Sequence, residues 1–160
     1  MSIAPRDEIQ ESAEGTETAE TQESSQHEVV LPEGWARPRG YSNGAVAAGK
    51  VVTVAGQIGW NPLSCMFDSV DFGAQTRQAL HNVVDVLLAA NARPQDLVRL
   101  TWYITDRDEY LAARKEIGAA YREIIGDHYP PMSVVFVSGL LEENAKVEIE
   151  ATAVIPEHAV

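Results

Sequence analysis

The chain has 160 residues, of which 45% are hydrophobic, and a formal net charge of −12 at pH 7. This length favours one domain with its own hydrophobic core. The acidic charge argues against a nucleic-acid partner, because affinity for a phosphate backbone depends largely on Lys and Arg side chains. The single cysteine, Cys65, excludes a disulfide within the chain and leaves no cysteine cluster for zinc.

The first 29 residues are rich in Glu, Ser, Thr and Gln, and they hold eight acids and one base. Such a segment buries too little apolar surface to offset the entropy that ordering would cost. We therefore expect residues 1–29 to be an acidic disordered tail and residues 30–160 to form the folded domain. The tail either solubilises the protein, which is the favoured interpretation, or docks onto a partner.

The start of the chain lacks the basic stretch and apolar run of a secretory signal. No apolar run approaches the length needed to cross a bilayer. A chain with one cysteine also fits a reducing compartment. The sequence therefore predicts a cytoplasmic protein without a membrane partner.

The first predicted elements are two short strands at residues 44–48 and 51–58, which would pair as a hairpin through a tight turn. Apolar residues at three- and four-residue spacing then predict a helix at 71–90. Asp71 or Ser69 is expected to cap the start of this helix, because both can accept a hydrogen bond from a free backbone amide.

A second helix is expected to begin at Asp106 or Asp108 and to end at Gly126, because Gly favours the position just after a helix. Three further strands are predicted, at residues 97–105, 133–138 and 146–155. The resulting order, β-β-α-β-α-β-β, indicates an α+β or mixed fold whose strands form one sheet.

The last predicted strand alternates strictly between two faces. One face carries Val147, Ile149, Ala151 and Ala153, and the other carries Glu148, Glu150, Thr152 and Val154. The apolar set suits a face covered by helices. The acidic set indicates either an ordinary solvent face, which is the favoured interpretation, or a face between subunits that is lined with acids.

Five segments spread over residues 35–156 carry recognisable motifs. They are VTVAGQI at 52–58 with the nearby Asn61-Pro62, QTRQALHNV at 75–83, Thr105-Asp106 at a strand end, YPPMSVVFV at 129–137 and VEIEA at 147–151. Each motif is short, but together and in this order they resemble the Rid (reactive intermediate deaminase) family.

The resemblance implies a chorismate-mutase-like fold and a homotrimer whose sheets close into a central barrel, with ligand clefts between subunits. It also implies hydrolysis of reactive enamines and imines, such as 2-aminoacrylate and its imine, to ketones and ammonia. No metal and no organic cofactor are implied. An imine carbon is already electrophilic, so the protein has only to bind the substrate, orient a water and move protons.

The resemblance also assigns roles to individual residues. Glu148 falls at the position that holds the attacking water, and Tyr41 falls at a tyrosine that contributes to the cleft, so these two are the candidate catalytic residues. Gly56, Ala55 and Ser133 fall at ligand-binding positions. Ala55 replaces the usual Ser, and the Gly56 backbone amide is expected to face the ligand.

Met132 stands where the family has an Arg that grips the substrate carboxylate. Met cannot donate a hydrogen bond, and a hydrogen bond to a charged group contributes roughly 1.5–3 kcal/mol. Either the ligand lacks that carboxylate or another cation enters the cleft. Arg114 is the candidate cation and a candidate ligand-binding residue, although a solvated Arg114 that pairs with Asp106, Glu109 or Glu116 is the favoured alternative.

We therefore expect a deaminase of an enamine or imine other than, or broader than, 2-aminoacrylate, with an aminomuconate-like catabolic intermediate as an illustration. The alternative is a trimer of the same fold that binds a small metabolite, such as a 2-oxo acid, without turnover. Ribonuclease activity has also been attached to the family, but the net charge and the absence of a basic groove in the sequence pattern argue against it.

Overall fold

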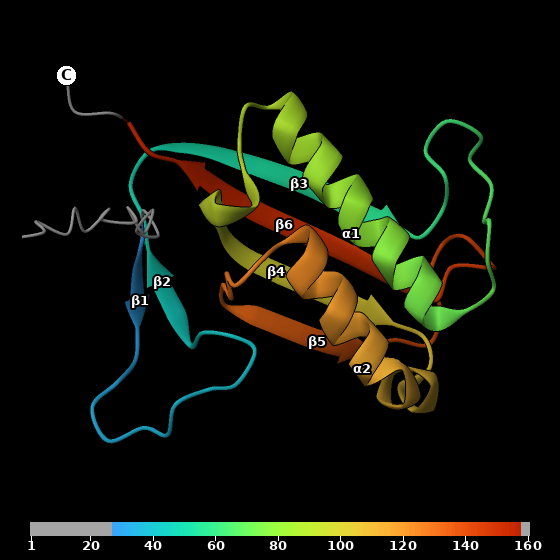
Figure 1. Ribbon diagram of the computed structural model, residues 1–160, viewed down its shortest axis with the longest axis horizontal. Coiled ribbons are helices and arrows are strands. Elements are labelled where there is room, and N and C mark those ends of the chain that lie inside the picture. Colours follow the sequence, from blue (N-terminus) through green and yellow to red (C-terminus); the bar gives the residue numbers. More distant parts are fainter. Residues whose placement is uncertain (1–26, 158–160) are drawn as a thin grey trace, which may run out of the picture.

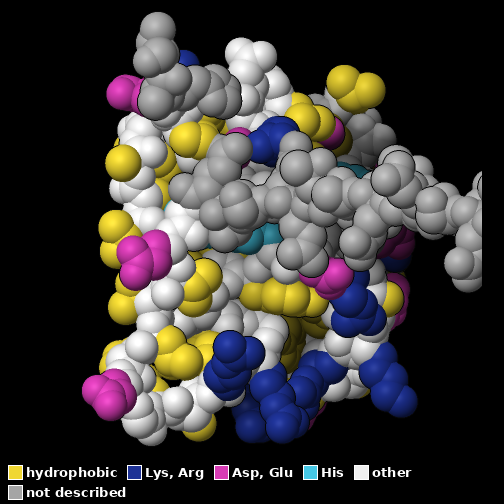
Figure 2. Space-filling model, turned by 60° about the vertical axis from the view of Figure 1, so that its left-hand side comes forward, with side chains coloured by type: hydrophobic (Ala, Val, Ile, Leu, Met, Phe, Trp, Pro, Cys, Tyr) yellow, Lys and Arg dark blue, Asp and Glu magenta, His cyan; other side chains and the backbone are white. Residues whose placement is uncertain are grey.

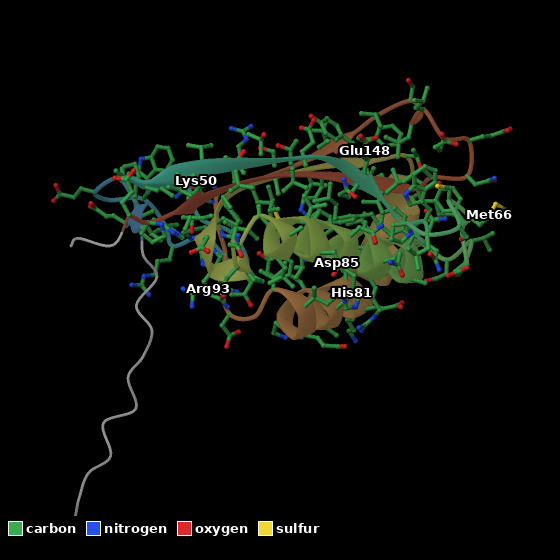
Figure 3. The ribbon with its side chains drawn as sticks, turned by 90° about the horizontal axis from the view of Figure 1, so that it is seen from above. Lys50, Met66, His81, Asp85, Arg93 and Glu148 are labelled. Atoms are coloured by element: carbon green, nitrogen blue, oxygen red, sulfur yellow. The ribbon has the colours of Figure 1, made fainter. Side chains whose placement is uncertain are left out.

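The computed structural model describes residues 27–157, so the predicted acidic tail lies almost entirely outside the described residues. The described part is dominated by a four-stranded sheet with two helices on one of its faces (Figure 1). Seen from above, sheet and helices form two layers, and no described helix covers the other face of the sheet (Figure 3). No helix among residues 27–157 is long and apolar enough to span a membrane.

Four strands form the main sheet in the order β3 (Lys50–Ile58), β6 (Val147–Ile155), β4 (Leu97–Ile104) and β5 (Met132–Phe136). β6 pairs antiparallel with both β3 and β4, whereas β5 pairs parallel with β4. A parallel pair needs a long crossover, which α2 (Arg107–Ile124) provides. The mixed sheet with two helices confirms the predicted α+β class.

The predicted hairpin between the first two predicted strands is wrong. β2 (Gly44–Val46) pairs instead with β1 (Glu28–Val30), a short strand that the sequence pattern does not predict and that begins before the expected domain boundary. β3 pairs with β6, because two nine-residue strands form a longer ladder than the three-residue β2 offers. The ladder is close at Gly49, where a Cβ atom would collide with the Ile155 carbonyl.

Both helices begin as the sequence predicts. α1 (Phe72–Ala89) follows Asp71, whose Oδ2 accepts a hydrogen bond from the Ala74 amide at 2.8 Å. α2 follows Asp106, whose Oδ1 accepts two backbone amides of the first turn at 2.8 and 2.9 Å. These bonds satisfy amides that have no partner inside the helix. Gly126 follows α2 with a φ of 88°, a conformation that Gly adopts at low cost.

The hydrophobic core lies between the helices and the sheet. Its largest buried side chains are Trp102, Leu80, Leu87, Leu97, Leu100, Ile125 and Ile149. β6 alternates as predicted, with its apolar residues in this core and Glu148 on the side away from the helices (Figure 3). We call that side the open face. On α1, Asn82 Nδ2 donates to the carbonyl oxygens of Ile58 and Trp60 at 3.0 Å each, which fixes the end of β3.

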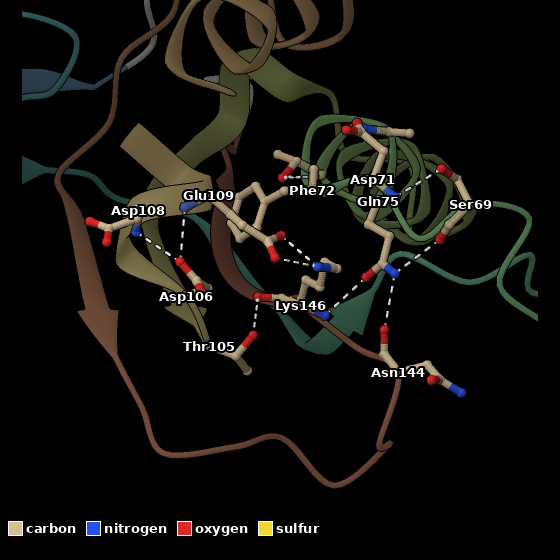
Figure 4. A network of polar contacts seen from close by, with 12 residues as sticks. Ser69, Asp71, Phe72, Gln75, Thr105, Asp106, Asp108, Glu109, Asn144 and Lys146 are labelled. Atoms are coloured by element: carbon tan, nitrogen blue, oxygen red, sulfur yellow. Dashed lines mark hydrogen bonds and ion pairs between the residues drawn. The ribbon is translucent and has the colours of Figure 1, made fainter. Parts of the chain in front are cut away.

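A polar network ties the start of β6 to both helices (Figure 4). Gln75 Nε2 on α1 donates to the carbonyl oxygens of Ser69 and Asn144 at 3.0 Å each, and its Oε1 accepts the Lys146 amide at 2.9 Å. Lys146 Nζ forms an ion pair with Glu109 Oε2 on α2 at 2.5 Å. Because β6 begins one residue after Lys146, the network fixes where the first residues of β6 lie.

Candidate functional site

Glu148, the expected water-holding residue, lies on β6 opposite an irregular part of β3. The register between these strands shifts between Val54 and Gln57, which marks a β-bulge. Gly56 lies in the bulge, and a Cβ atom built on it would overlap the Glu148 carboxylate. The absence of a side chain at Gly56 therefore creates the space that the carboxylate occupies. Two of the predicted site residues are brought together here, with the exposed Ala55 beside them.

The environment of Glu148 favours its protonated form more than water does. Burial raises the pKa of this carboxyl, and the like charge of Glu150 on the same strand face raises it further. Tyr103 on β4 is in register with Glu148, and its hydroxyl donates to Glu150 Oε2 at 2.9 Å. A carboxylate with a raised pKa is suited to accept a proton from water and to return it later.

A cavity of about 430 Å³ lies on the helix side of the sheet, between α2 and strands β4 and β5. We call it the α2 cavity. Met132 and Arg114, two of the predicted ligand-binding residues, both line it. The expected ion pair of Arg114 is not found: Glu109 pairs with Lys146 instead, and Arg114 has no ion pair with another residue of 27–157. Arg114 is an exposed cation at the cavity.

Tyr41 and Ser133 line a smaller cavity of about 240 Å³, and Met132 lines this cavity too. Ser42 fixes the position of Tyr41, because its amide and hydroxyl donate to the carbonyl oxygens of residues 130 and 129 at 3.3 and 2.5 Å. Tyr41 remains 44% exposed, so it is accessible to a ligand or to another chain.

Within one chain Glu148 and Met132, the two central residues of the predicted site, do not lie together. Met132 is in register with the buried Leu100 and packs against the core. Glu148 is in register with Tyr103 and lies on the open face. Their register partners on β4, Leu100 and Tyr103, are also three residues apart, or about 10 Å. Glu148 with Gly56 and Ala55, the Glu148 group, and Met132 with Arg114, the Met132 group, therefore lie on opposite faces of the sheet. Ser133 follows Met132 on β5 and is in register with Thr101, which faces Glu150 on β6, so it belongs to the open face.

Charge is unevenly spread over the surface. The chain has a net charge of −12, yet Figure 2 shows Lys and Arg side chains gathered along one edge of the molecule, beside exposed hydrophobic side chains. Among the residues that line the α2 cavity, Arg114 and Arg122 are both cationic and exposed. Cations at the rim of a cavity raise the local concentration of small anions.

The sequence profile of the endoribonuclease L-PSP family matches residues 35–155. The chain belongs to this family. Its relatives include a RutC family protein of Pyrococcus horikoshii, which is 32% identical over 126 residues, or 79% of this chain and 96% of the relative. The 2-iminobutanoate/2-iminopropanoate deaminase of Escherichia coli is 32% identical over 112 residues, or 68% of this chain and 83% of the relative. The resemblance to the Rid family is thereby confirmed.

Solved structures of the Rid family have the same fold. A Rid family protein of Yersinia pestis superimposes with a TM-score of 0.72 at 31% identity, over 81% of this chain and 99% of that protein. Escherichia coli TdcF with bound serine superimposes with a TM-score of 0.58 at 30% identity, over 84% of this chain and 97% of that protein. The latter structure shows that a Rid-family protein binds a small molecule.

Several residues near the two groups of this Rid-family chain were not predicted from the sequence. Tyr103 could have been found, because it alternates with Trp102 on β4 and one of the two rings must therefore face the open side. Trp102 and Gly118 line the α2 cavity. The only sequence feature that could have drawn attention to Gly118 is the presence of a Gly inside a predicted helix. Among residues 27–157, no three His, Cys, Asp or Glu side chains are grouped so that they could hold a metal ion.

Proposed function

We propose that this Rid-family chain hydrolyses a reactive enamine or imine, with Glu148 as the residue that positions and deprotonates the attacking water. The observation that carries the proposal is the contact between Glu148 and Gly56. It places a partly buried carboxylate with a raised pKa in a space that only a glycine leaves open.

We further propose that the working form is a homotrimer whose sheets close into a central barrel, with the site between subunits. The division of the site residues between two sheet faces supports this, because the Glu148 group and the Met132 group can meet on one ligand when they belong to different chains. The β5 edge also supports it: Val134, Val135 and Phe136 are 41, 41 and 60% exposed. An apolar strand edge of this kind is normally covered.

The proposed reaction begins when Glu148 takes a proton from water and the hydroxide adds to the imine carbon. With the imine nitrogen already protonated, this addition gives a neutral carbinolamine. Its amine then takes the proton from Glu148, the carbon–nitrogen bond breaks, and ammonia leaves as the carbonyl forms and releases the hydroxyl proton to solvent. Glu148 is thereby ionised again, one water is consumed and one ammonia is released. Tyr41 and the Gly56 backbone orient the ligand, together with Ala55 and Ser133.

Arg114 supplies the positive charge that an arginine would supply at position 132, where this chain has Met132. Both residues line the α2 cavity, and Arg114 has no acidic partner among the described residues. Because Arg114 lies on α2 and Met132 on β5, a carboxylate bound by Arg114 sits elsewhere than one bound at position 132. The substrate is therefore expected to be larger than 2-aminoacrylate, and 2-aminomuconate is a suitable example to assay.

The test is ammonia release from freshly generated 2-aminoacrylate and from 2-aminomuconate. Glu148→Gln is expected to lower kcat/KM by about 10²- to 10⁴-fold, the usual contribution of a general base. Glu142→Gln removes the same charge from an exposed position before β6 and is the matched control. Equal rates for wild type and Glu148→Gln would remove Glu148 from the mechanism.

A second candidate function is metabolite binding without turnover, and the apolar Met132 at the expected arginine position favours it. Stabilisation of the protein by 2-oxo acids, measured as a rise in Tm, without ammonia release from either amine would support this function over the enzyme.

A further inference from the structure

The α2 cavity has the size and lining of a site for an apolar ligand. Its volume of about 430 Å³ lies within the usual range for small-molecule sites, and a three-carbon substrate would leave much of it empty. The lining is largely aromatic and aliphatic, and it includes Trp102, Tyr110, Tyr121, Tyr129, Met132 and Val134. Flat rings along the walls favour a planar ligand.

Trp102, one of the residues that line the cavity, carries a buried hydrogen-bond donor. This residue is 2% exposed, and its indole Nε1 is buried without a hydrogen-bond partner among the described residues. A buried donor without an acceptor is unfavourable and rare in folded proteins. By contrast, the hydroxyl of the neighbouring Tyr121 donates to the His128 carbonyl at 2.8 Å. An oxygen atom of a ligand would satisfy the indole N–H once the side chains that cover it move aside on binding.

Four residues of α2 line the cavity at four-residue spacing, Tyr110, Arg114, Gly118 and Arg122, and so lie on one side of the helix. Gly in a helix interior is destabilising, and packing does not require it at 118. A Cβ atom there would meet only Arg122 Nη1, at an ordinary contact distance of 3.5 Å. Gly118 therefore leaves space between two arginines that have no ion pair with described residues.

We propose that the α2 cavity binds a planar, conjugated or aromatic carboxylate. Trp102 Nε1 donates to one oxygen of the ligand, Arg114 pairs with the charge, and the space at Gly118 admits the flat body of the molecule. The inference deepens the proposed function by naming the class of substrate: an enamine or imine on a planar chain that ends in a carboxylate.

Binding of trans-cinnamate to the full-length protein tests this proposal directly by isothermal titration. Cinnamate is expected to bind at least about ten-fold more tightly than pyruvate, which lacks the planar body, and than cinnamamide, which lacks the charge. Arg114→Gln should remove the preference for cinnamate over cinnamamide, whereas Arg107→Gln, at the first residue of α2, should leave it unchanged.

A matched pair of variants tests the space in the cavity. Gly118→Leu fills it and is expected to weaken cinnamate binding by about ten-fold or more. Ala119→Leu adds a similar side chain at an exposed neighbouring position outside the lining and should have no effect. If Gly118→Leu weakens cinnamate binding no more than Ala119→Leu does, the space at Gly118 is not used and the proposal is wrong.

The indole N–H resonances test the role of Trp102 without changing it. The chain has three tryptophans, so Trp35→Phe and Trp60→Phe identify the Trp102 signal by elimination. Cinnamate should shift this signal downfield as the hydrogen bond forms. An unmoved signal on saturation would overturn the assigned donor.

Failure of this proposal can be distinguished from failure of the proposed function. If cinnamate binding depends on Gly118 and Arg114 but no amine is hydrolysed, the proposed ligand class is supported and the proposed deaminase activity is wrong. If ammonia release depends on Glu148 but cinnamate binding is absent, or is insensitive to Gly118→Leu and Arg114→Gln, the ligand class is wrong and the enzyme stands.

Discussion

The two faces of the four-stranded sheet differ in charge and in what covers them. The helix side holds the hydrophobic core and, near β5, a cavity lined by two arginines and several aromatic rings. The open face holds Glu148 and Glu150 beside Tyr103. Because neighbouring residues of a strand point in opposite directions, this division follows from the alternation of β4, β5 and β6.

On the proposed function, one chain carries two incomplete halves of a site. The open face offers a base that can move a proton, and its cation, Arg99, lies four residues before Tyr103 on β4. The α2 cavity offers a cation, an apolar space and the Trp102 donor, but among its lining residues there is no acid. A second copy that brings its open face to the first copy's cavity would join the two halves.

The largest expected effect comes from mixing two inactive variants. Glu148→Gln lacks the base and Arg114→Ala lacks the cation, and each alone should lose most of its ammonia-releasing activity. When the two variants are co-expressed in equal amounts, 148 is still Glu in one half of the chains and 114 is still Arg in the other half. Roughly one interface in four should then be complete, and activity should return to about a quarter of wild type.

Co-expression of Glu148→Gln with Gly56→Val is the control, because both variants damage the same half and no interface can be restored. If the first mixture is as inactive as this control, the two halves do not meet between chains.

A smaller loss is expected from Gly56→Ala. The added Cβ atom would overlap the Glu148 carboxylate and must displace it, and a misplacement of about 1 Å in a catalytic group can reduce a rate by about 10²-fold. The loss should appear mainly in kcat, because the displaced group is the base that moves the proton. Gly139→Ala is the matched control, since a Cβ atom at Gly139 meets nothing within 4 Å. Equal losses in both variants would indicate a general effect on folding.

The smallest effect is a change in pH dependence. Glu148 must be ionised to act as a base, so activity should fall as the pH drops through its pKa, which burial and the charge of Glu150 raise above the usual range. Glu150→Gln removes that charge, so the pKa of Glu148 should fall and the acidic limb of the rate profile should move to lower pH.

Glu157→Gln removes the same charge beyond the end of β6 and should not move the acidic limb of the rate profile.

Thermal stability provides an independent check on the raised pKa of Glu148. A raised pKa in the folded state means that ionisation of Glu148 disfavours folding. The contribution of this side chain to the free energy of unfolding is therefore favourable at low pH and is lost as the pH rises through the raised pKa. Glu148→Gln should therefore not lower Tm at neutral pH, and a large decrease would contradict this account of the site.

Local sequence patterns predicted much of the fold. Strict alternation placed Glu148 opposite the core, and the aspartates at 71 and 106 marked where the helices begin. Five short motifs in order were enough to identify the Rid family. These features depend on residues that are close in sequence, where the period of a strand or the free amides of a helix end leave few alternatives.

Pairings between distant segments could not be predicted in the same way. The partner of β2 proved to be β1 rather than β3, because strand pairing depends on which partner offers the longer ladder, and neighbouring residues carry no information about this. Among residues 27–157 Arg114 has no acidic partner, and the Glu109 carboxylate pairs instead with Lys146, 37 residues further along the chain. The space for Glu148 at Gly56 likewise required the bulge that only the β3–β6 ladder reveals.

By itself, the sequence determined the class of fold, the limits of the helices and which residues of β6 face away from the core. Only the tertiary structure decided that Met132 and Glu148 lie on opposite faces, that Arg114 and Trp102 share a cavity, and that Gly56 makes room for a carboxylate. The reason is physical: periodicity and capping are set by neighbours along the chain, whereas cavities and contacts are set by how distant segments pack.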